Sequence, residues 1–192
     1  MSRAIKAPAT LPELVTTAFS KARADGELLY FPTRVALLPV PMPFQLRFSP
    51  AFADKPKKPK TSSPPTDPFA NPPASLYVGS VGPGHYVVLN KFAIVAEHFI
   101  LATNEFQKQT ELLALADLEA TMACVRAYKQ TKRGLFAFFN SGEHSGASQP
   151  HRHIQLLPVE LPSRRRTLRH LRRGHRPRGS SRTGARVISE AL

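Results

Sequence analysis

The sequence predicts an α+β domain in which helices pack on an antiparallel sheet. Two segments show the apolar spacing of helices, at residues 11–22 and 117–132. Several short runs are rich in β-forming residues, and two of them are joined by a loop of turn-forming residues. The 192 residues, 42% of them hydrophobic, are enough for the core of one domain.

The first predicted helix spans residues 11–22. Its apolar residues recur at helical spacing: Leu11, Leu14, Val15, Ala18, Phe19 and Ala22. The dipeptide Asp25-Gly26 follows and is typical of a helix end. We therefore expect an amphipathic helix with one face packed on the domain.

Residues 54–73 are expected to form a long surface loop. They contain seven Pro together with Lys, Ser and Thr. Proline has no N–H to donate and favours extended conformers, so this composition argues against a helix.

A buried strand is expected at residues 86–91, which are rich in β-forming side chains. Residues 92–95 are expected to continue or kink this strand, which would give a strand pair or a bent strand. The second helix is predicted over residues 117–132, with Asp117 as its N-cap and Gly134 after its end. Its packed face is predicted to carry Leu118, Met122, Val125 and Tyr128.

Two further strands are predicted at residues 135–139 and 151–157, with turn residues between them. Side chains alternate between the faces of a strand, so His151, His153 and Gln155 should share one face. Arg152, Ile154 and Leu156 should point to the other face. Members of the first row would stand roughly 6.6 Å apart.

This row permits nucleotidyl transfer. A neutral imidazole is abundant near its usual pKa of about 6.5 and can attack an electrophilic phosphorus. Attack on an α-phosphate gives a nucleotidyl-histidine, which can pass the nucleotide to a second acceptor. The preceding loop adds small residues, including Gly142 and Gly146, whose backbone amides can approach anionic oxygens or simply form turns.

The motif HRHIQ at residues 151–155 resembles the His-x-His-x-Gln signature of the transferase branch of the histidine-triad superfamily. Two other blocks, LNKFAIVAEHFILATNEF at 89–106 and FFNSG at 138–142, resemble the fungal diadenosine tetraphosphate phosphorylases, or ATP adenylyltransferases. The resemblance covers roughly residues 10–160. It implies a histidine-triad-like fold.

The resemblance also implies roles for individual residues. The nucleophile would be His153, Gln155 would contact the phosphate and the leaving oxygen, and His151 would orient the nucleophile. Nucleotide and phosphate contacts would come from Lys55, Asn90, Lys91, Asn140, Gly146, Ala147, Ser148 and Gln149.

The implied reaction is phosphorolysis of diadenosine tetraphosphate to ATP and ADP. Its partners would be a dinucleoside polyphosphate and inorganic phosphate. The motif requires no cofactor and no protein-bound metal, and a divalent metal carried by the nucleotide is compatible with it. Gln155 stands where triad hydrolases have a third histidine, which suits a polyphosphate that already leaves readily as an anion.

Other interpretations stay open. A similar strand serves sugar-phosphate nucleotidyltransferases, and His151 with His153 could form a metal pair, although no third ligand of suitable spacing is evident. Family members are longer, and their later region supplies further substrate contacts. A truncated nucleotide-binding protein without turnover is therefore the alternative to an enzyme.

The formal charge of +14 is concentrated at one end of the chain. Residues 163–192 contain ten Arg and one acid, so we expect residues 1–162 to form the domain and 163–192 a disordered tail or the product of a shifted reading frame. The tail lacks aromatic residues interleaved with Arg, which argues against nucleic-acid binding.

The single cysteine, Cys124, and the lack of a long apolar run or signal-peptide core predict a protein without disulfides or membrane spans. We expect a cytoplasmic location, with the nucleus as a second compartment.

Overall fold

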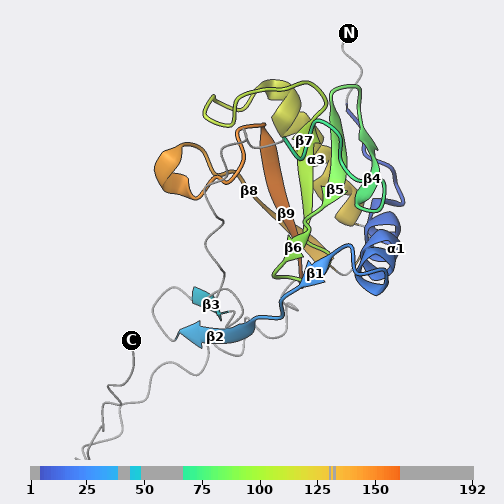
Figure 1. Ribbon diagram of the computed structural model, residues 1–192, viewed down its shortest axis with the longest axis vertical. Coiled ribbons are helices and arrows are strands. Elements are labelled where there is room, and N and C mark those ends of the chain that lie inside the picture. The colour runs from blue at the N-terminus through green and yellow to red at the C-terminus, as the bar shows by residue number, and fades with distance from the viewer. Residues whose placement is uncertain (1–4, 39–43, 49–66, 130, 132, 161–192) are drawn as a thin grey trace, which may run out of the picture. The chain divides into compact units, whose positions relative to one another are not determined.

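The computed structural model describes residues 5–38, 44–48, 67–129, 131 and 133–160 (Figure 1). The chain divides into two units, residues 1–161 and 162–192, and every element described below belongs to the first. The predicted tail and residues 54–66 of the predicted Pro-rich loop lie outside the described residues. Helices and an antiparallel sheet are both present, so the α+β class is confirmed.

The central sheet has five strands in the order β4-β5-β7-β9-β8, and every neighbouring pair is antiparallel. The strands are β4 (Tyr77–Val81), β5 (His85–Leu89), β7 (Phe99–Thr103), β9 (His153–Glu160) and β8 (Arg133–Phe138). The strands predicted at 86–91, 135–139 and 151–157 are confirmed as β5, β8 and β9, with shifted ends.

Four short strands form two separate pairs. β1 (Leu29–Tyr30) runs parallel to β6 (Phe92–Ala93), and β2 (Arg34–Leu38) runs antiparallel to β3 (Phe44–Phe48). The expected continuation of β5 into residues 92–95 is wrong. The chain turns at Lys91, whose carbonyl accepts a hydrogen bond from Leu29 N–H, so β6 belongs to a different pair.

Helix α1 (Leu11–Ala24) confirms the first predicted helix. Its buried residues are Leu11, Val15, Phe19 and Ala22, as the spacing predicts. Leu14, which was expected on the same face, is 39% exposed. The helix contacts α3, β4 and β5, so it packs on the central sheet (Figure 1).

Helix α3 (Leu115–Tyr128) corrects the second helix prediction. Ala114 is the N-cap, and Asp117 lies in the first turn, where its carboxylate accepts a hydrogen bond from Ala114 N–H at 2.7 Å. The predicted packed face is also wrong for Leu118 and Met122, which are 49% and 44% exposed.

The buried face of α3 carries Asp117, Ala120, Ala123, Cys124 and Tyr128 instead. Small side chains at three of these positions let the helix lie close to the sheet. Tyr128, correctly expected on this face, stacks on Phe99 of β7 with ring centroids 5.9 Å apart. Both helices thus cover one face of the sheet.

Candidate functional site

The side chains of β9 divide between the two faces of the sheet as the alternation predicts. Arg152, just before the strand, reaches Asp117 on the face that the helices cover. His153 and Gln155 line a cavity of about 570 Å³ on the other face. The apolar part of this cavity includes Leu76, Val88 and Ile100.

Six of the predicted site residues line this cavity: Asn90, Lys91, Ser148, Gln149, His153 and Gln155. They come from the end of β5, from the loop before β9, and from β9 itself. Residues that are far apart in the sequence therefore meet around one space, which is of the size that small-molecule sites usually have.

The remaining predicted residues lie elsewhere. Asn140, Gly146 and Ala147 belong to the 140–152 loop, which contains the 3₁₀ helix η1 (Glu143–Ser145). The Asn140 side-chain amide donates to Ser145 O, and Gly146 has a φ of +79°, which favours glycine. Ala147 lines a smaller depression beside Ser148 and Gln149. Lys55 lies outside the described residues.

His153 is held with one ring nitrogen free to act as a nucleophile. Its Nδ1 lies 2.7 Å from His151 O, and because a carbonyl only accepts, Nδ1 must carry the proton. In the neutral ring, Nε2 then keeps its lone pair. Burial lowers the pKa of His153 below its usual 6.5, while the hydrogen bond to His151 O opposes this shift, so the neutral form is favoured.

His151 is 1% exposed and does not line the cavity. Its Nδ1 lies 2.7 Å from Asp67 Oδ2, and its Nε2 lies 2.9 Å from Thr103 O. Both ring nitrogens therefore face protein oxygens, which argues against the metal-pair interpretation. Among the described residues, no group of three His, Cys, Asp or Glu is placed to hold a metal ion.

Gln109 is a site residue that the sequence analysis missed. It is 2% exposed, and its Oε1 accepts a hydrogen bond from His153 N–H at 2.7 Å. Its Nε2 donates to His153 O at 3.0 Å and to Asn140 O at 2.8 Å. One amide thus fixes the backbone of His153 and ties it to the start of the 140–152 loop.

Replacing Gln109 with glutamate is expected to lower the free energy of unfolding by at least about 2–3 kcal/mol, because a carboxylate would face two carbonyl oxygens in a buried place. The matched control is Gln107→Glu, because Gln107 is exposed in the same segment, and its effect should stay within about 0.5 kcal/mol. Urea unfolding of both variants provides the measurement. Equal effects of the two substitutions would contradict the role given to Gln109.

His98 lies beside the row, 3% exposed, with its ring 3.4 Å from the Asn90 side-chain nitrogen. Burial lowers its pKa to about 4, and a hydrogen bond between His98 and Gln155 opposes only part of this shift. His98 is therefore neutral at physiological pH. It contacts Asn90, which follows β5, and Gln155 of β9, and both of these residues line the cavity.

His98 should make the protein less stable in acid. Below about pH 6.5 the unfolded chain binds a proton at this residue, whereas the folded protein does so only near pH 4. The stability that comes from keeping His98 neutral is fully present above pH 6.5. Between pH 6.5 and about pH 4 the free energy of unfolding falls by up to about 1.4 kcal/mol per pH unit. We expect His98→Gln to reduce this slope in unfolding measurements from pH 7 to 4. His144→Gln, at an exposed position, should leave the slope unchanged, and an unchanged slope in His98→Gln would refute the assignment.

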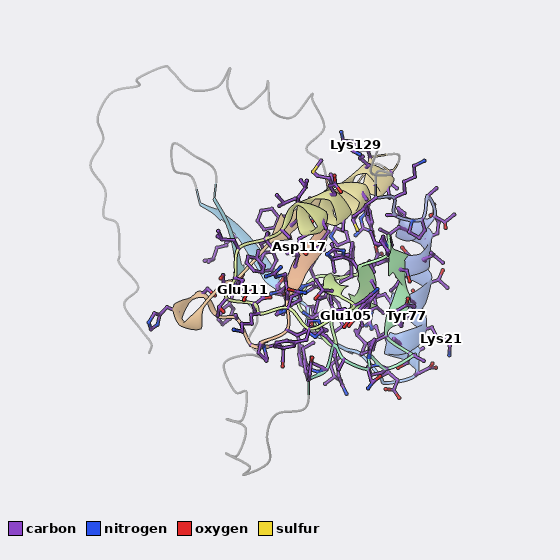
Figure 2. All side chains as sticks on the ribbon, turned by 90° about the horizontal axis from the view of Figure 1, so that it is seen from above. Lys21, Tyr77, Glu105, Glu111, Asp117 and Lys129 are labelled. Atoms are coloured by element: carbon purple, nitrogen blue, oxygen red, sulfur yellow. The ribbon has the colours of Figure 1, made fainter. Side chains whose placement is uncertain are left out.

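Arg152 anchors the motif to the helix layer from the other face of the sheet. Its guanidinium lies 3.2 Å from Asp117 Oδ2 and 3.2 Å from Glu111 Oε2. Asp117 Oδ1 also lies 2.8 Å from His85 Nε2. Figure 2 shows Asp117 at the start of α3, beside β9. The residue between the two motif histidines is thus fixed by a buried cluster of charged and polar groups.

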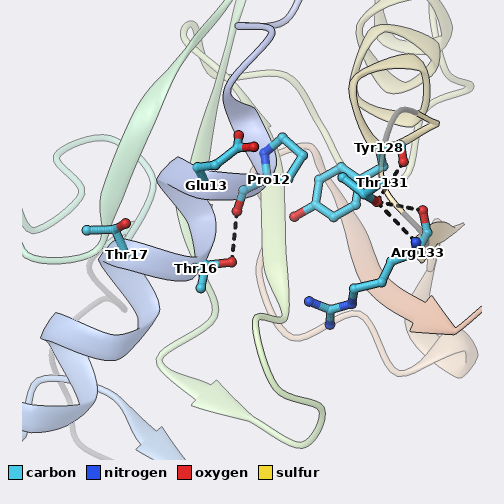
Figure 3. Close-up of a pocket in the computed structure, with 7 residues that line it drawn as sticks. All are labelled: Pro12, Glu13, Thr16, Thr17, Tyr128, Thr131 and Arg133. Atoms are coloured by element: carbon cyan, nitrogen blue, oxygen red, sulfur yellow. Dashed lines mark hydrogen bonds between the residues drawn. The ribbon is translucent and has the colours of Figure 1, made fainter.

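A second cavity, of about 360 Å³, lies between α1 and the segment after α3 (Figure 3). Three of its lining residues are hydrogen-bonded or paired within the protein, whereas the buried Tyr128 hydroxyl has no hydrogen-bond partner among the described residues. The Thr16 hydroxyl donates to Pro12 O at 2.9 Å, and the Thr131 hydroxyl donates to Tyr128 O at 2.8 Å. Arg133 pairs with Glu97 at 2.6 Å. The large cavity is the better candidate for chemistry, because it is lined by His153 and by five other predicted site residues.

Comparisons with known proteins agree with this geometry. The model of the family described as Ap4A phosphorylase N-terminal domain matches residues 1–169. Protein APA1 of Saccharomyces cerevisiae is 30% identical over 162 residues, covering 79% of this chain and 50% of that protein. Diadenosine tetraphosphate phosphorylase 2 of the same yeast is 36% identical over 126 residues, covering 60% and 39%.

Solved structures of an Ap4A phosphorylase are also similar to this chain. The crystal structure of yeast Ap4A phosphorylase Apa2 in complex with AMP superposes with a TM-score of 0.68 at 29% identity, covering 78% of this chain and 49% of that one. The complex of Apa2 with Ap4A gives a TM-score of 0.65 at 26% identity. The chain spans about half the length of these relatives. None of the described helices is long and apolar enough to cross a membrane.

The resemblance to the diadenosine tetraphosphate phosphorylases found in the sequence is confirmed, and the chain shares its α+β fold with yeast Apa2. A family model that covers residues 1–169 includes the whole central sheet and the row of His153 and Gln155. The chain belongs to the Ap4A phosphorylase N-terminal domain family.

Proposed function

We propose that this chain carries out adenylyl transfer from Ap4A to inorganic phosphate. One observation carries the proposal: His153 Nδ1 is hydrogen-bonded to His151 O, so the unprotonated Nε2 is available beside a cavity lined by polar residues. The names of the relatives, an Ap4A phosphorylase among them, support the choice of substrate.

The reaction proceeds in two displacements. His153 Nε2 attacks the α-phosphorus of one adenosine, the bond from that phosphorus to its bridging oxygen breaks, and ATP leaves. An oxygen of inorganic phosphate then attacks the same phosphorus, and the P–N bond breaks. The products are one ATP and one ADP, and Nε2 regains its lone pair.

Each of the cavity residues has a role in this proposal. The Gln155 amide contacts the phosphate and the oxygen that leaves, while Ser148 and Gln149 donate hydrogen bonds to the charge that develops. Lys91 and Asn90 bind the phosphate chain or the nucleotide from the end of β5. His151 orients His153 through its carbonyl. Asn140, Gly146 and Ala147 shape the loop that carries Ser148 and Gln149.

Several features stay predictions: a nucleotide contact at Lys55, a domain over residues 1–162 with a separate Arg-rich tail, a cytoplasmic location, and a divalent metal that arrives with the nucleotide. The tail has no assigned role in transfer.

The test is an assay of the full chain with Ap4A in the presence and absence of inorganic phosphate, with nucleotides separated by ion-exchange chromatography. We expect equal amounts of ATP and ADP, formed only when phosphate is present. Galactose 1-phosphate in place of phosphate tests the sugar-phosphate alternative, since a new sugar nucleotide would support that enzyme instead. Binding of Ap4A without any product would leave the chain a nucleotide-binding protein and would contradict transfer.

A further inference from the structure

We propose that Asp67 is a positioning residue for the nucleophile, acting through His151 and Phe69. The proposal rests on the function proposed above, since it assigns the element that holds His153 ready for attack. Asp67, Pro68 and Phe69, which we call the Asp67–Phe69 clamp, belong to the described part of the Pro-rich segment 54–73, and Asp67 lies 84 residues before His151.

The first contact of the clamp is with the ring of His151. Asp67 Oδ2 lies 2.7 Å from His151 Nδ1, while Thr103 O lies 2.9 Å from His151 Nε2. The Thr103 hydroxyl donates to Glu105 O at 2.8 Å, so toward the ring it too acts as an acceptor. The imidazole is therefore held at both nitrogens. Because the His151 ring is buried and close-packed, it has no room to turn. Holding the ring at both nitrogens therefore also holds the backbone of His151 in place.

The backbone of His151 is the part that touches the nucleophile. Its carbonyl oxygen accepts the hydrogen bond from His153 Nδ1 at 2.7 Å. If this carbonyl moved, the Nδ1 proton would lose its acceptor, and the tautomer with the proton on Nε2 would become competitive. Only the Nδ1–H tautomer leaves Nε2 able to attack.

The second contact of the clamp is with the ring of His153. The other carboxylate oxygen, Asp67 Oδ1, accepts a hydrogen bond from Phe69 N–H at 2.9 Å and so closes a tight turn. The Phe69 ring lies 5.0 Å from the His153 ring, at 35° to it, and is 7% exposed. Tyr86 secures the same residue, because its hydroxyl donates to Phe69 O at 2.6 Å.

One carboxylate thus contacts two residues that hold the ring of His153 in place. Through His151 it holds the acceptor of the Nδ1 proton, and through Phe69 it holds the surface against which the ring packs. Asp67 does not itself have to touch the reacting phosphorus for this effect.

The test compares Asp67→Ala with Asp67→Asn. Alanine removes both contacts, and we expect kcat for phosphorolysis to fall about 10- to 100-fold with a smaller change in KM. Asparagine can still accept from Phe69 N–H and can donate to His151 Nδ1 while His151 Nε2–H donates to Thr103 O, so its kcat should stay within about fivefold of the wild type. Asp25→Ala, which removes an exposed carboxylate on the end of α1, is the control and should leave kcat unchanged.

A second measurement separates this proposal from the proposed function. Long-range proton–nitrogen correlation spectra of the histidine-labelled protein report the tautomer of His153 without any substrate. We expect the Nδ1–H form in the wild type and in Asp67→Asn, and a mixture with the Nε2–H form in Asp67→Ala. These spectra can be interpreted even if the chain turns over no Ap4A.

The outcomes decide the proposal. It is overturned if Asp67→Ala keeps the His153 tautomer of the wild type together with full kcat. If Asp67→Ala does not fold, Phe69→Leu removes only the ring packing. A reduced kcat in that variant, with the Nδ1–H form of His153 retained, supports the clamp, and a wild-type kcat overturns it.

Discussion

Replacing His153 with alanine is expected to abolish adenylyl transfer, with a loss of more than about 10⁴-fold, because His153 supplies the only imidazole among the described residues that line the cavity. The measurement uses Ap4A labelled in the α-phosphates. The wild-type protein should acquire label that is stable in base and labile in acid, as expected for a phosphoramidate. The His153→Ala protein should acquire none.

The control for this experiment is His144→Ala. His144 is an exposed histidine of η1 in the same loop region, so its removal tests whether the loss is specific to position 153. It should be labelled to the wild-type level. Acid-labile label retained by His153→Ala would refute the assignment of the nucleophile.

Replacing Asp117 with alanine should produce the largest loss of stability, about 3–5 kcal/mol in the free energy of unfolding. Asp117 is 3% exposed and lies within hydrogen-bond distance of Arg152, His85 and the N–H of Ala114. Its removal would leave the buried Arg152 guanidinium with the Lys108 carbonyl and a single charged partner, the partly exposed Glu111. Chemical unfolding at neutral pH measures the effect.

Glu111 provides the matched control because it contacts the same guanidinium at the same distance, 3.2 Å. Its side chain is 53% exposed, so water screens the pair and Glu111→Ala should cost less than about 1 kcal/mol. If the two variants lost equal stability, burial of Asp117 would not be the source of its effect.

The sequence predicted those elements whose signal is local. Apolar residues at helical spacing identify α1, and β-forming runs with turn residues between them identify β8 and β9. Strand β7 was missed although all five of its residues are buried. A central strand that is covered on both faces shows no alternation, so periodicity gives no signal for it. β1 and β6 have two residues each and form only because they meet in the fold.

The face of α3 could not be predicted for a different reason. Hydrophobic spacing favours Leu118 and Met122, yet the close approach of the helix to the sheet selects Ala120, Ala123 and Cys124. Asp117 looks like an N-cap in the sequence. Its burial depends on His85 and Arg152, which lie 32 and 35 residues away in the chain.

The candidate site shows the same division. Alternation along β9 predicted that His153 and Gln155 share a face, and the two residues line one cavity. Gln109, His98 and Asp67 gave no signal, because each acts through contacts with distant segments. Gln109 is 44 residues from His153, and Asp67 is 84 residues from His151. The reacting groups lie together in one short motif, whereas the residues that position them are scattered along the chain, so a single sequence reveals the former and not the latter.

Peptide mapping of the trapped intermediate tests the central claim most directly. The protein is incubated with Ap4A without inorganic phosphate, digested with trypsin at alkaline pH, and analysed by mass spectrometry. Cleavage after Arg152 separates His151 from His153, which starts the peptide of residues 153–164. We predict an adenylyl group on that peptide, at His153. An adenylyl group on any other residue, or phosphorolysis that proceeds with no adduct at His153, would contradict the account.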